Sequence, residues 1–258
     1  IPMKLNIVNV ATLLCAMQNK KVLVLGDVML DRFIDGAVTR ISPEAPVPIL
    51  SQSRVCQMAG GAANVACNLA QLGLHVHLIG VCGNDKAAKD LETEISGYPA
   101  IQFDPVRIKD RPTSLKTRYR AGGQQILRVD EEITDDINDK SIKNVLKLVK
   151  AALDDADLII ISDYGKGTLP LPLLSQIIAT AKAKRKHIIA DPKRKDVSAY
   201  ANIDLLTPNL TELKAITAMH LNNIDEIGNA AKALAKTHGF GGILTTLSAR
   251  GMILSQQD

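Results

Sequence analysis

Tryptophan is absent from the 258 residues, and phenylalanine and tyrosine bring the aromatic share to only 3%. A core must therefore be built from Ala, Val, Ile and Leu, which suits buried parallel strands covered by helices. No apolar run reaches the roughly 18–20 residues that a transmembrane helix needs, so we expect no membrane partner. With 46% hydrophobic and 22% charged residues, the sequence is typical of a globular chain rather than a disordered one.

Paired cysteines are missing as well. No two of the four cysteines have the CxxC spacing of zinc sites or thioredoxin-like motifs; they are Cys15, Cys56, Cys67 and Cys82. We interpret them as reduced thiols of a cytoplasmic protein. Residues 1–19 lack the cleavage pattern and basic start of a signal peptide. His75 and His77 lie at strand spacing with no evident third ligand, so a structural role is favoured over metal binding.

Charge is not concentrated either. The net charge is +4, and the two basic runs, residues 182–186 and 193–195, have no aromatic residues between them. A solvated helix end and loop are the preferred interpretation, and we expect no nucleic-acid partner. A functional role for either run would favour a phosphate-bearing ligand.

What is present is a repeated alternation of strand and helix periodicity. Strands are predicted at residues 21–26, 76–81, 158–162, 187–190, 205–207 and 243–247. Helices are predicted at residues 61–72, 86–95, 141–153, 171–184, 211–217 and 224–237. This order predicts an α/β fold with a doubly wound, mostly parallel sheet in one domain, residues 1–258.

Two stretches break this alternation. Residues 47–55 alternate like an edge strand with a proline, and residues 115–130 predict a hairpin that turns at Gly122 and Gly123. Lys116, Arg118 and Arg120 fall on one face of its first strand. Together these pieces predict a small β lid, from segments at about 33–58 and 100–130, over the ligand-binding ends of the main strands.

Side chains that could bind a sugar occur in two places. Asp27 follows a buried strand, where α/β folds bind ligands, although a loop or capping role is preferred for this residue alone. Residues 59–64 read Ala-Gly-Gly-Ala-Ala-Asn at the start of a helix. The backbone of Gly60 and Gly61 can approach a ligand there, and Asn64 can both donate and accept. The run is not GxGxxG, so a dinucleotide site is disfavoured.

These motifs resemble a known family. Gly60-Gly-Ala-Ala-Asn-Val-Ala66 with Gly73 and Gly83 matches the first signature of the PfkB/ribokinase-family carbohydrate kinases, and residues 26–32 resemble their sugar-binding strand. Arg40-Ile-Ser-Pro-Glu-Ala-Pro-Val-Pro48 resembles a narrower group, the bacterial D-glycero-β-D-manno-heptose 7-phosphate kinases, a domain of bifunctional ADP-heptose synthesis proteins. Residues 162–167, 191–193 and 207–212 fit the same group. The resemblance, from about residue 20 onward, implies a ribokinase-like fold and ATP-dependent phosphorylation with Mg²⁺.

The resemblance also implies roles for single residues. It implies that the sugar phosphate is bound by Asp27, Asp31, Gly60, Gly61, Asn64, Lys116, Arg118, Arg128, Asp163 and Lys166. It implies that the nucleotide is bound by Lys193, Asn209, Leu210, Thr211 and Glu212, and that Glu212 is the metal partner. The lid cations would hold the substrate's own phosphate, since Arg and Lys suit that group. Asn209 and Glu212 also have capping-box spacing, and both roles can hold together.

One part of the family pattern is missing. No Gly-Ala-Gly-Asp occurs in the sequence, although the family uses that motif for an anion hole and for the Asp that deprotonates the attacking hydroxyl. We therefore expect no catalytic residue in this chain, with the base Asp beyond Asp258, and a kinase domain that is incomplete at its C-terminal end. The His-x-Gly-His motif of an adenylyltransferase is absent too.

Four hypotheses remain. The first is phosphorylation of the anomeric hydroxyl of D-glycero-D-manno-heptose 7-phosphate, which gives the 1,7-bisphosphate for lipopolysaccharide core. The second is a PfkB-type kinase for another sugar, and the third is a catalytically incomplete sugar-binding module. A nicotinamide dehydrogenase suits the fold class but lacks a Rossmann fingerprint. The resemblance also implies a homodimer that pairs through the lid strands.

Overall fold

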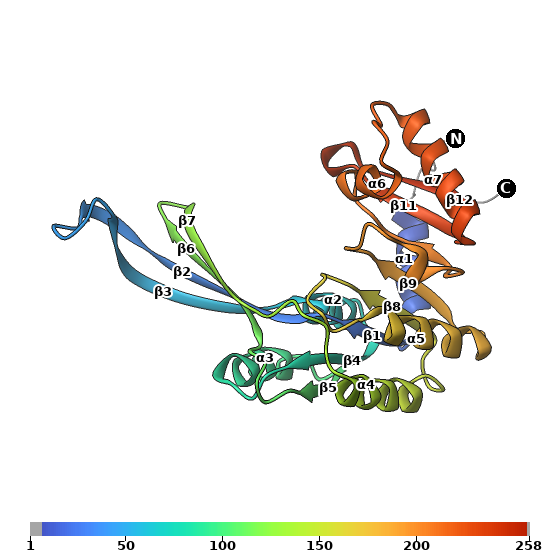
Figure 1. Cartoon of the computed structure of the whole chain (residues 1–258), viewed down its shortest axis with the longest axis horizontal. Helices are drawn as coiled ribbons and strands as arrows, with labels where there is room; N and C mark the ends of the chain where they lie inside the picture. Colours follow the sequence, from blue (N-terminus) through green and yellow to red (C-terminus); the bar gives the residue numbers. More distant parts are fainter. Residues whose placement is uncertain (1–6, 257–258) are drawn as a thin grey trace.

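An eight-stranded sheet forms the body of the molecule, in a computed structural model that describes residues 7–256. Its strand order is β12-β11-β10-β9-β8-β1-β4-β5 (Figure 1). The strands are β1 (Lys21–Gly26), β4 (His75–Cys82), β5 (Ile101–Arg107), β8 (Leu158–Ser162), β9 (His187–Asp191), β10 (Leu205–Leu206), β11 (Gly242–Thr246) and β12 (Met252–Gln256). Only the β11–β12 pair is antiparallel within this sheet, which confirms the predicted doubly wound, mostly parallel arrangement.

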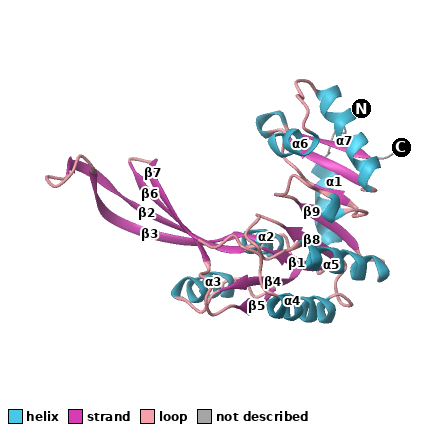
Figure 2. Cartoon of the chain, in the orientation of Figure 1, coloured by secondary structure: helices cyan, strands magenta, loops and turns pink. Residues whose placement is uncertain are grey.

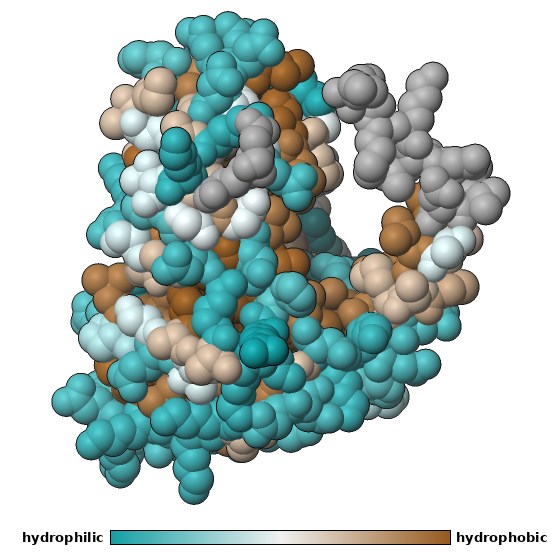
Figure 3. All heavy atoms as spheres, turned by 90° about the vertical axis from the view of Figure 1, so that its right-hand side faces the viewer, coloured by the Kyte–Doolittle hydropathy of each residue, from teal (hydrophilic) through white to brown (hydrophobic). Residues whose placement is uncertain are grey.

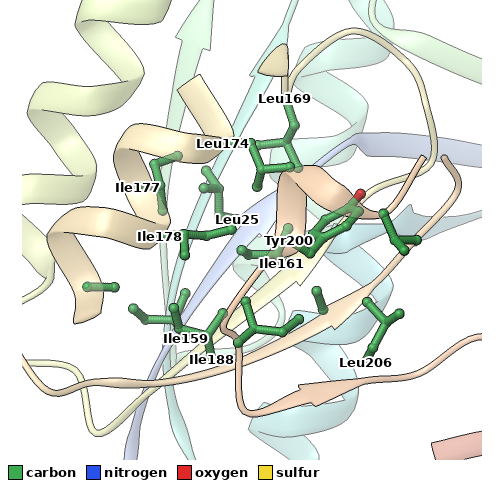
Figure 4. Close-up of a cluster of buried hydrophobic side chains, with 14 of the residues drawn as sticks. Leu25, Ile159, Ile161, Leu169, Leu174, Ile177, Ile178, Ile188, Tyr200 and Leu206 are labelled. Carbon is green, nitrogen blue, oxygen red and sulfur yellow. The ribbon is translucent and has the colours of Figure 1, made fainter. Parts of the chain in front are cut away.

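Both faces of the sheet are covered near its centre, because successive side chains of β1 point to opposite sides. Leu23 and Leu25 belong to one core cluster, with side chains of α4 (Asp139–Ala152), α5 (Leu171–Ala183) and α7 (Ile224–His238). Val22 and Val24 belong to the other, with side chains of α2 (Ala62–Gln71) and α3 (Lys86–Ser96). Figure 4 shows part of the first cluster, in which Tyr200 of the short 3-10 helix η1 (Ser198–Tyr200) lies among leucines and isoleucines. Burial on both sides thus requires the apolar run Val22–Leu25 within β1.

Helix starts in the body follow their capping residues. Asp85 accepts a hydrogen bond from the Ala88 N–H at the start of α3, and Asn138 accepts one from the Ser141 N–H at the start of α4. Short polar side chains at these positions satisfy N–H groups that have no partner within the helix. The observed helices therefore begin within one or two residues of the predicted ones.

A second, four-stranded sheet projects from the body as a long arm (Figures 1 and 2). Its order is β3-β2-β6-β7, from β2 (Val28–Ile41), β3 (Pro48–Gly61), β6 (Ser114–Ala121) and β7 (Gln124–Glu131). β2 pairs with β3 and β6 with β7 in antiparallel fashion, while β2 and β6 run parallel. The β6–β7 turn lies at Gly122 and Gly123, both at positive φ, as the sequence predicts. We call this sheet the lid.

The structure differs from the sequence-based expectations in three elements. β2, a strand of 14 residues, was not predicted as a strand beyond its start, because charged side chains interrupt its apolar pattern. Residues 101–107 fell within the expected second lid segment but form β5, at the edge of the main sheet next to β4. Pro105 is tolerated there because β5 has a partner on one side only. Helix α1 (Ile7–Met17) was not predicted, and the rest of the 1–19 segment lies outside the described residues.

Apolar surface remains at the far end of the sheet. Met252 and Leu254 of β12 are 63% and 54% exposed, and Leu13 of α1 is 54% exposed. Figure 3 shows brown, hydrophobic side chains around a hollow on this side of the molecule. No helix within residues 7–256 has both the length and the apolar character to cross a membrane. All four cysteines are free.

Candidate active site

The carboxyl ends of the central strands meet at one edge of the body. β1 lies between β8 and β4, and the chain continues from these two neighbours in different directions. Open α/β sheets bind ligands at such a switch point, and we refer to this edge of the sheet as the crevice. Asp27 follows β1, residues 163–168 follow β8, Asp191 ends β9 and Asn209 follows β10. The sequence-predicted sugar and nucleotide residues are therefore brought to the same edge.

Asp27 is 1% exposed, and its carboxylate organises the loop after β8. It accepts hydrogen bonds from the backbone N–H groups of Tyr164 (2.8 Å), Lys166 (3.1 Å) and Thr168 (3.2 Å). Burial raises the pKa of the Asp27 carboxyl, and the Thr168 side chain and the N–H groups of Lys166 and Tyr164 act against that increase. The side chain thus fixes the floor of the crevice, and its contact with a sugar hydroxyl stays a prediction.

Gly60 and Gly61 are the last residues of β3, where the backbone comes very close to the start of β2. A Cβ at Gly60 would lie 2.5 Å from Asp31 Oδ2, and one at Gly61, whose φ is +56°, would lie 2.3 Å from the Asp27 carbonyl oxygen. Glycine is needed at Gly61, where the φ is positive and the neighbouring atom belongs to the backbone, whereas at Gly60 the neighbouring atoms belong to the Asp31 and Met29 side chains. Asn64 is exposed in the first turn of α2, where a ligand can reach it.

The crevice-facing side of the lid carries paired charges. Lys116, Arg118 and Arg120 share one face of β6, as predicted, and Arg128 of β7 pairs opposite Arg118. The ion pairs on this face are Lys116–Asp130, Lys116–Glu132, Arg118–Asp31, Arg120–Asp35 and Arg128–Asp130. The Arg118 guanidinium also lies 5.3 Å from the centre of the Phe33 ring. The predicted phosphate-binding cations are therefore together, each with an acidic partner.

Lys166 connects this charged face to the body. Its ammonium group contacts Glu132, the residue directly after β7, and Glu132 also contacts Lys116. Glu132 was missed by the sequence analysis. A signal was present, because the two-residue period that places Arg128 and Asp130 on this face also places Glu132 there.

Asp163 has a different place from the one expected. It is 3% exposed, and its carboxylate accepts hydrogen bonds from Arg194 Nε (2.8 Å), from the Tyr200 hydroxyl (2.5 Å) and from the Gly165 N–H (2.8 Å). We expected Asp163 to face the crevice beside Lys166, and instead it points into the wall beneath. The reason is that a buried carboxylate needs partners, and Arg194 and Tyr200 supply them.

Arg111 is a second residue that sequence reasoning missed. Its guanidinium donates to the carbonyl oxygens of Asp135 (2.9 Å), Ile133 (2.8 Å) and Lys166. One side chain therefore ties the segment that leaves the lid to the loop after β8. No local motif could reveal this role, because the carbonyl oxygens of distant segments leave no trace in the sequence.

At the end of the crevice where nucleotide binding is predicted, Asn209 and Glu212 form the predicted capping box of α6 (Leu210–Thr217). The Asn209 side chain accepts from the Glu212 N–H (2.9 Å), and one Glu212 oxygen accepts from the Asn209 N–H (3.0 Å). The other Glu212 oxygen lies 3.2 Å from Lys193 Nζ. Burial raises the pKa of Asp191 to about 6, and the charge of Glu212 adds to this increase.

The carboxylates of Asp191 and Glu212 are the groups at this site that could hold a magnesium ion. Mg²⁺ is held in proteins by one or two carboxylates, with waters and substrate phosphates completing its shell. Asp191 and Glu212 are two oxygen donors whose mutual repulsion a cation would relieve. The described residues contain no cluster of three or more such ligands, so the fit is to a cation shared with a nucleotide.

A pocket of about 570 Å³ lies beside the α6 N-terminus. It is lined by Asn209, Leu210, Thr211, Thr246, Leu247, Ser248 and Arg250. The sequence analysis had not singled out the last four residues, of which Thr246 ends β11 and the other three follow it. A larger pocket, about 650 Å³, lies between α4 and the amino ends of β1 and β4. Because it contains none of the predicted site residues, the smaller pocket is the relevant one here.

Solved structures define the class of this arrangement. Phosphofructokinase-2 from Escherichia coli in complex with substrates and products matches with a TM-score of 0.75 at 20% identity, over 93% of this chain and 76% of that chain. Ribokinase from Arabidopsis thaliana complexed with ribose and ATP matches with a TM-score of 0.68 at 19% identity, over 93% and 75%. The fold is therefore ribokinase-like.

Residues 19–258 match the pfkB family of carbohydrate kinases, and the chain belongs to this family. Bifunctional protein HldE from Hyphomonas neptunium is 42% identical over 239 residues, and its homologue from Shewanella sp. (strain MR-4) is 41% identical over 241 residues. Each alignment covers 93% of this chain and 49% of the relative. The chain thus spans about half the length of the curated relatives that it matches.

Proposed function

We propose that this chain is the sugar-phosphate-binding part of an ATP-dependent kinase that phosphorylates the anomeric hydroxyl of D-glycero-D-manno-heptose 7-phosphate. The product would be the 1,7-bisphosphate used for ADP-heptose and lipopolysaccharide core in the cytoplasm. The observation that carries the proposal is a group of cations, Lys116, Arg118 and Arg128 of the lid and Lys166 of the loop after β8, whose backbone N–H contacts Asp27. Such a group suits a sugar that already bears a phosphate. The likeness to HldE proteins supports the choice of heptose.

ATP would bind at the other end of the crevice. Lys193, Asn209, Leu210, Thr211 and Glu212 lie around the α6 N-terminus, whose free N–H groups and dipole favour phosphate oxygens. Mg²⁺ beside Glu212 and Asp191 would neutralise charge on the phosphates. The chain's own residues hold and orient the sugar and the phosphates. Because the sequence contains no Gly-Ala-Gly-Asp motif, we infer that the group that accepts the hydroxyl proton is not among these 258 residues.

A kinase assay on the full-length gene product tests the substrate. We expect turnover of heptose 7-phosphate at a kcat/KM far above that for ribose, fructose and fructose 6-phosphate. A preference for an unphosphorylated sugar would overturn the substrate assignment and leave a PfkB kinase for another sugar. Calorimetry on the 258-residue chain tests whether it binds the substrate but lacks the group that accepts the hydroxyl proton. We expect binding of the sugar phosphate without ATP turnover.

We further propose that the protein forms a homodimer through the lid. On the face opposite the charged one, Val55, Ile34, Tyr119 and Leu127 lie in register across all four strands. Val55 is 46% and Leu127 54% exposed, so this apolar row is uncovered in the single chain. Sedimentation analysis of wild type and L127E tests the proposal, because a charge within a buried row opposes association. A wild-type monomer would overturn it.

A further inference from the structure

Glu132 lies between the lid and the loop after β8, which a substrate in the crevice would have to bridge. Its carboxylate is 2.9 Å from Lys116 Nζ, on β6 of the lid, and it also contacts Lys166 Nζ, on the loop after β8. The three side chains are only 13–20% exposed. One carboxylate therefore joins the lid to the floor of the crevice through two lysines.

The charges around Glu132 alternate in sign. The order along the crevice is Arg128, Asp130, Lys116, Glu132 and Lys166, with each neighbouring pair in contact. Burial acts to raise the pKa of Glu132, yet that pKa lies below its ordinary value because Lys166 and Lys116 donate hydrogen bonds to the carboxylate. At neutral pH the group is ionised, and both lysines are occupied by an anion that belongs to the protein itself.

We propose that Glu132 stands in for the phosphate of the substrate, so that it determines specificity for a sugar that carries a phosphate group. The inference rests on the proposed function. A phosphate carries more charge than a carboxylate and has three acceptor oxygens, so it can satisfy both lysines and displace Glu132. A neutral sugar has no group that can do this. By contacting both lysines, Glu132 keeps them from the hydroxyl groups of a neutral sugar, whereas a phosphate can exchange with it.

Displacement also has a consequence for the lid. Because the Lys116–Glu132–Lys166 contacts link β6 to the body, a ligand that replaces Glu132 takes over that link and holds the lid through its own phosphate. In one arrangement Glu132 links the lid to the body, and in the other the phosphate of the ligand does so. A ligand can shift the equilibrium between them only by the difference between its binding free energies for the two arrangements. Glu132 determines this difference in binding free energy, because the phosphate must displace it from the two lysines.

The experiment is calorimetry on the 258-residue chain with inorganic phosphate and, separately, with heptose 7-phosphate. E132Q keeps the size of the side chain and removes the competing charge, so we expect the Kd of both ligands to fall by about threefold to tenfold. E131Q is the matched control, because Glu131 is the exposed neighbour on the other face of the strand, and we expect no change. Circular dichroism checks the fold. If E132Q does not fold, E132D, whose shorter side chain cannot span both lysines, replaces it.

The outcomes separate the two proposals. An unchanged or higher Kd for inorganic phosphate in E132Q, or no phosphate binding by either chain, overturns the role of Glu132. Binding of inorganic phosphate that tightens in E132Q, with no binding of heptose 7-phosphate, supports that role and counts against the proposed substrate. Equal binding of heptose 7-phosphate by wild type and E132Q supports the substrate and overturns the role of Glu132.

Discussion

The two ends of the crevice are built on opposite electrostatic principles. At the sugar end, the cations predicted to bind phosphate all contact acids, and the buried Asp27 is satisfied by three N–H groups. At the nucleotide end, Asp191 and Glu212 repel each other, and burial keeps the pKa of Asp191 near 6. One end is stable as it stands, whereas the other is relieved by a cation. The difference indicates that ligand binding reorganises contacts at the first end and removes strain at the second.

The largest expected effect is at the sugar end, in D27A. The buried Thr168 N–H and the partly buried N–H groups of Tyr164 and Lys166 would lose their acceptor. Loss of an acceptor costs about 1–3 kcal/mol for a buried group, so we expect a total loss of roughly 3–5 kcal/mol. The measurement is the free energy of unfolding in urea. D31N, whose carboxylate is partly exposed and has one cationic partner, is the comparison. A loss below that of D31N would show that Asp27 does not organise the loop.

R111M should come next. The substitution keeps the length of the side chain and removes the donors to three carbonyl oxygens, so we expect a loss of roughly 2–3 kcal/mol in the free energy of unfolding. We also expect faster hydrogen exchange in residues 163–168, while α7 keeps its protection. Uniform loss of protection across the body would mean that Arg111 supports the whole fold rather than the link between lid and loop.

The nucleotide end should respond in the opposite direction. A carboxyl whose pKa is raised in the folded state binds its proton more tightly there than in the unfolded chain, so its contribution to stability falls as pH rises from about 4 to 6. D191N should therefore be more stable than wild type at pH 7, by about 1–2 kcal/mol after screening is allowed for. Urea unfolding at pH 4 and pH 7 measures this.

Magnesium supplies the control for that experiment. Mg²⁺ should raise the Tm of wild type more than that of D191N, because the cation relieves a repulsion that D191N no longer has. If wild type and D191N were equally stable at pH 7, the charge of Asp191 would not destabilise the fold, and the electrostatic difference between the two ends of the crevice would be contradicted.

The smallest effect is expected for K193M. The Lys193 side chain is 57% exposed, and exposed ion pairs contribute about 0–1 kcal/mol, so stability should change by less than about 0.5 kcal/mol. The same substitution should weaken binding of ATP, measured by calorimetry on the full-length protein. K116M, from the partly buried network of the sugar end, should cost more stability than K193M. The reverse order would contradict the comparison.

Sequence patterns correctly predicted most helices and strands, the side chains that share one face of β6, and the capping box of α6. The two-residue period placed Lys116, Arg118 and Arg120 on one face, and capping spacing paired Asn209 with Glu212. These patterns are local, so they can be read along the chain. β2 was hidden because its charged residues pair with neighbouring strands, which a single segment does not reveal.

Side-chain partners across the site could not be predicted in the same way. The N–H groups that Asp27 binds lie at least 137 positions away in sequence, and the Lys166 carbonyl that Arg111 binds is 55 positions away. Asp163 looked like a crevice residue because it follows a strand, but the buried Tyr200 and Arg194 decide its direction. Such contacts depend on how the strands are ordered, not on any spacing between residues.

The lid has a consequence for the order of folding. Its two hairpins, β2–β3 and β6–β7, each close short loops, whereas the parallel β2–β6 seam joins residues such as Leu30 and Leu115. Loop closure costs more entropy as the loop lengthens, so we expect the hairpins to form early and the seam to form late.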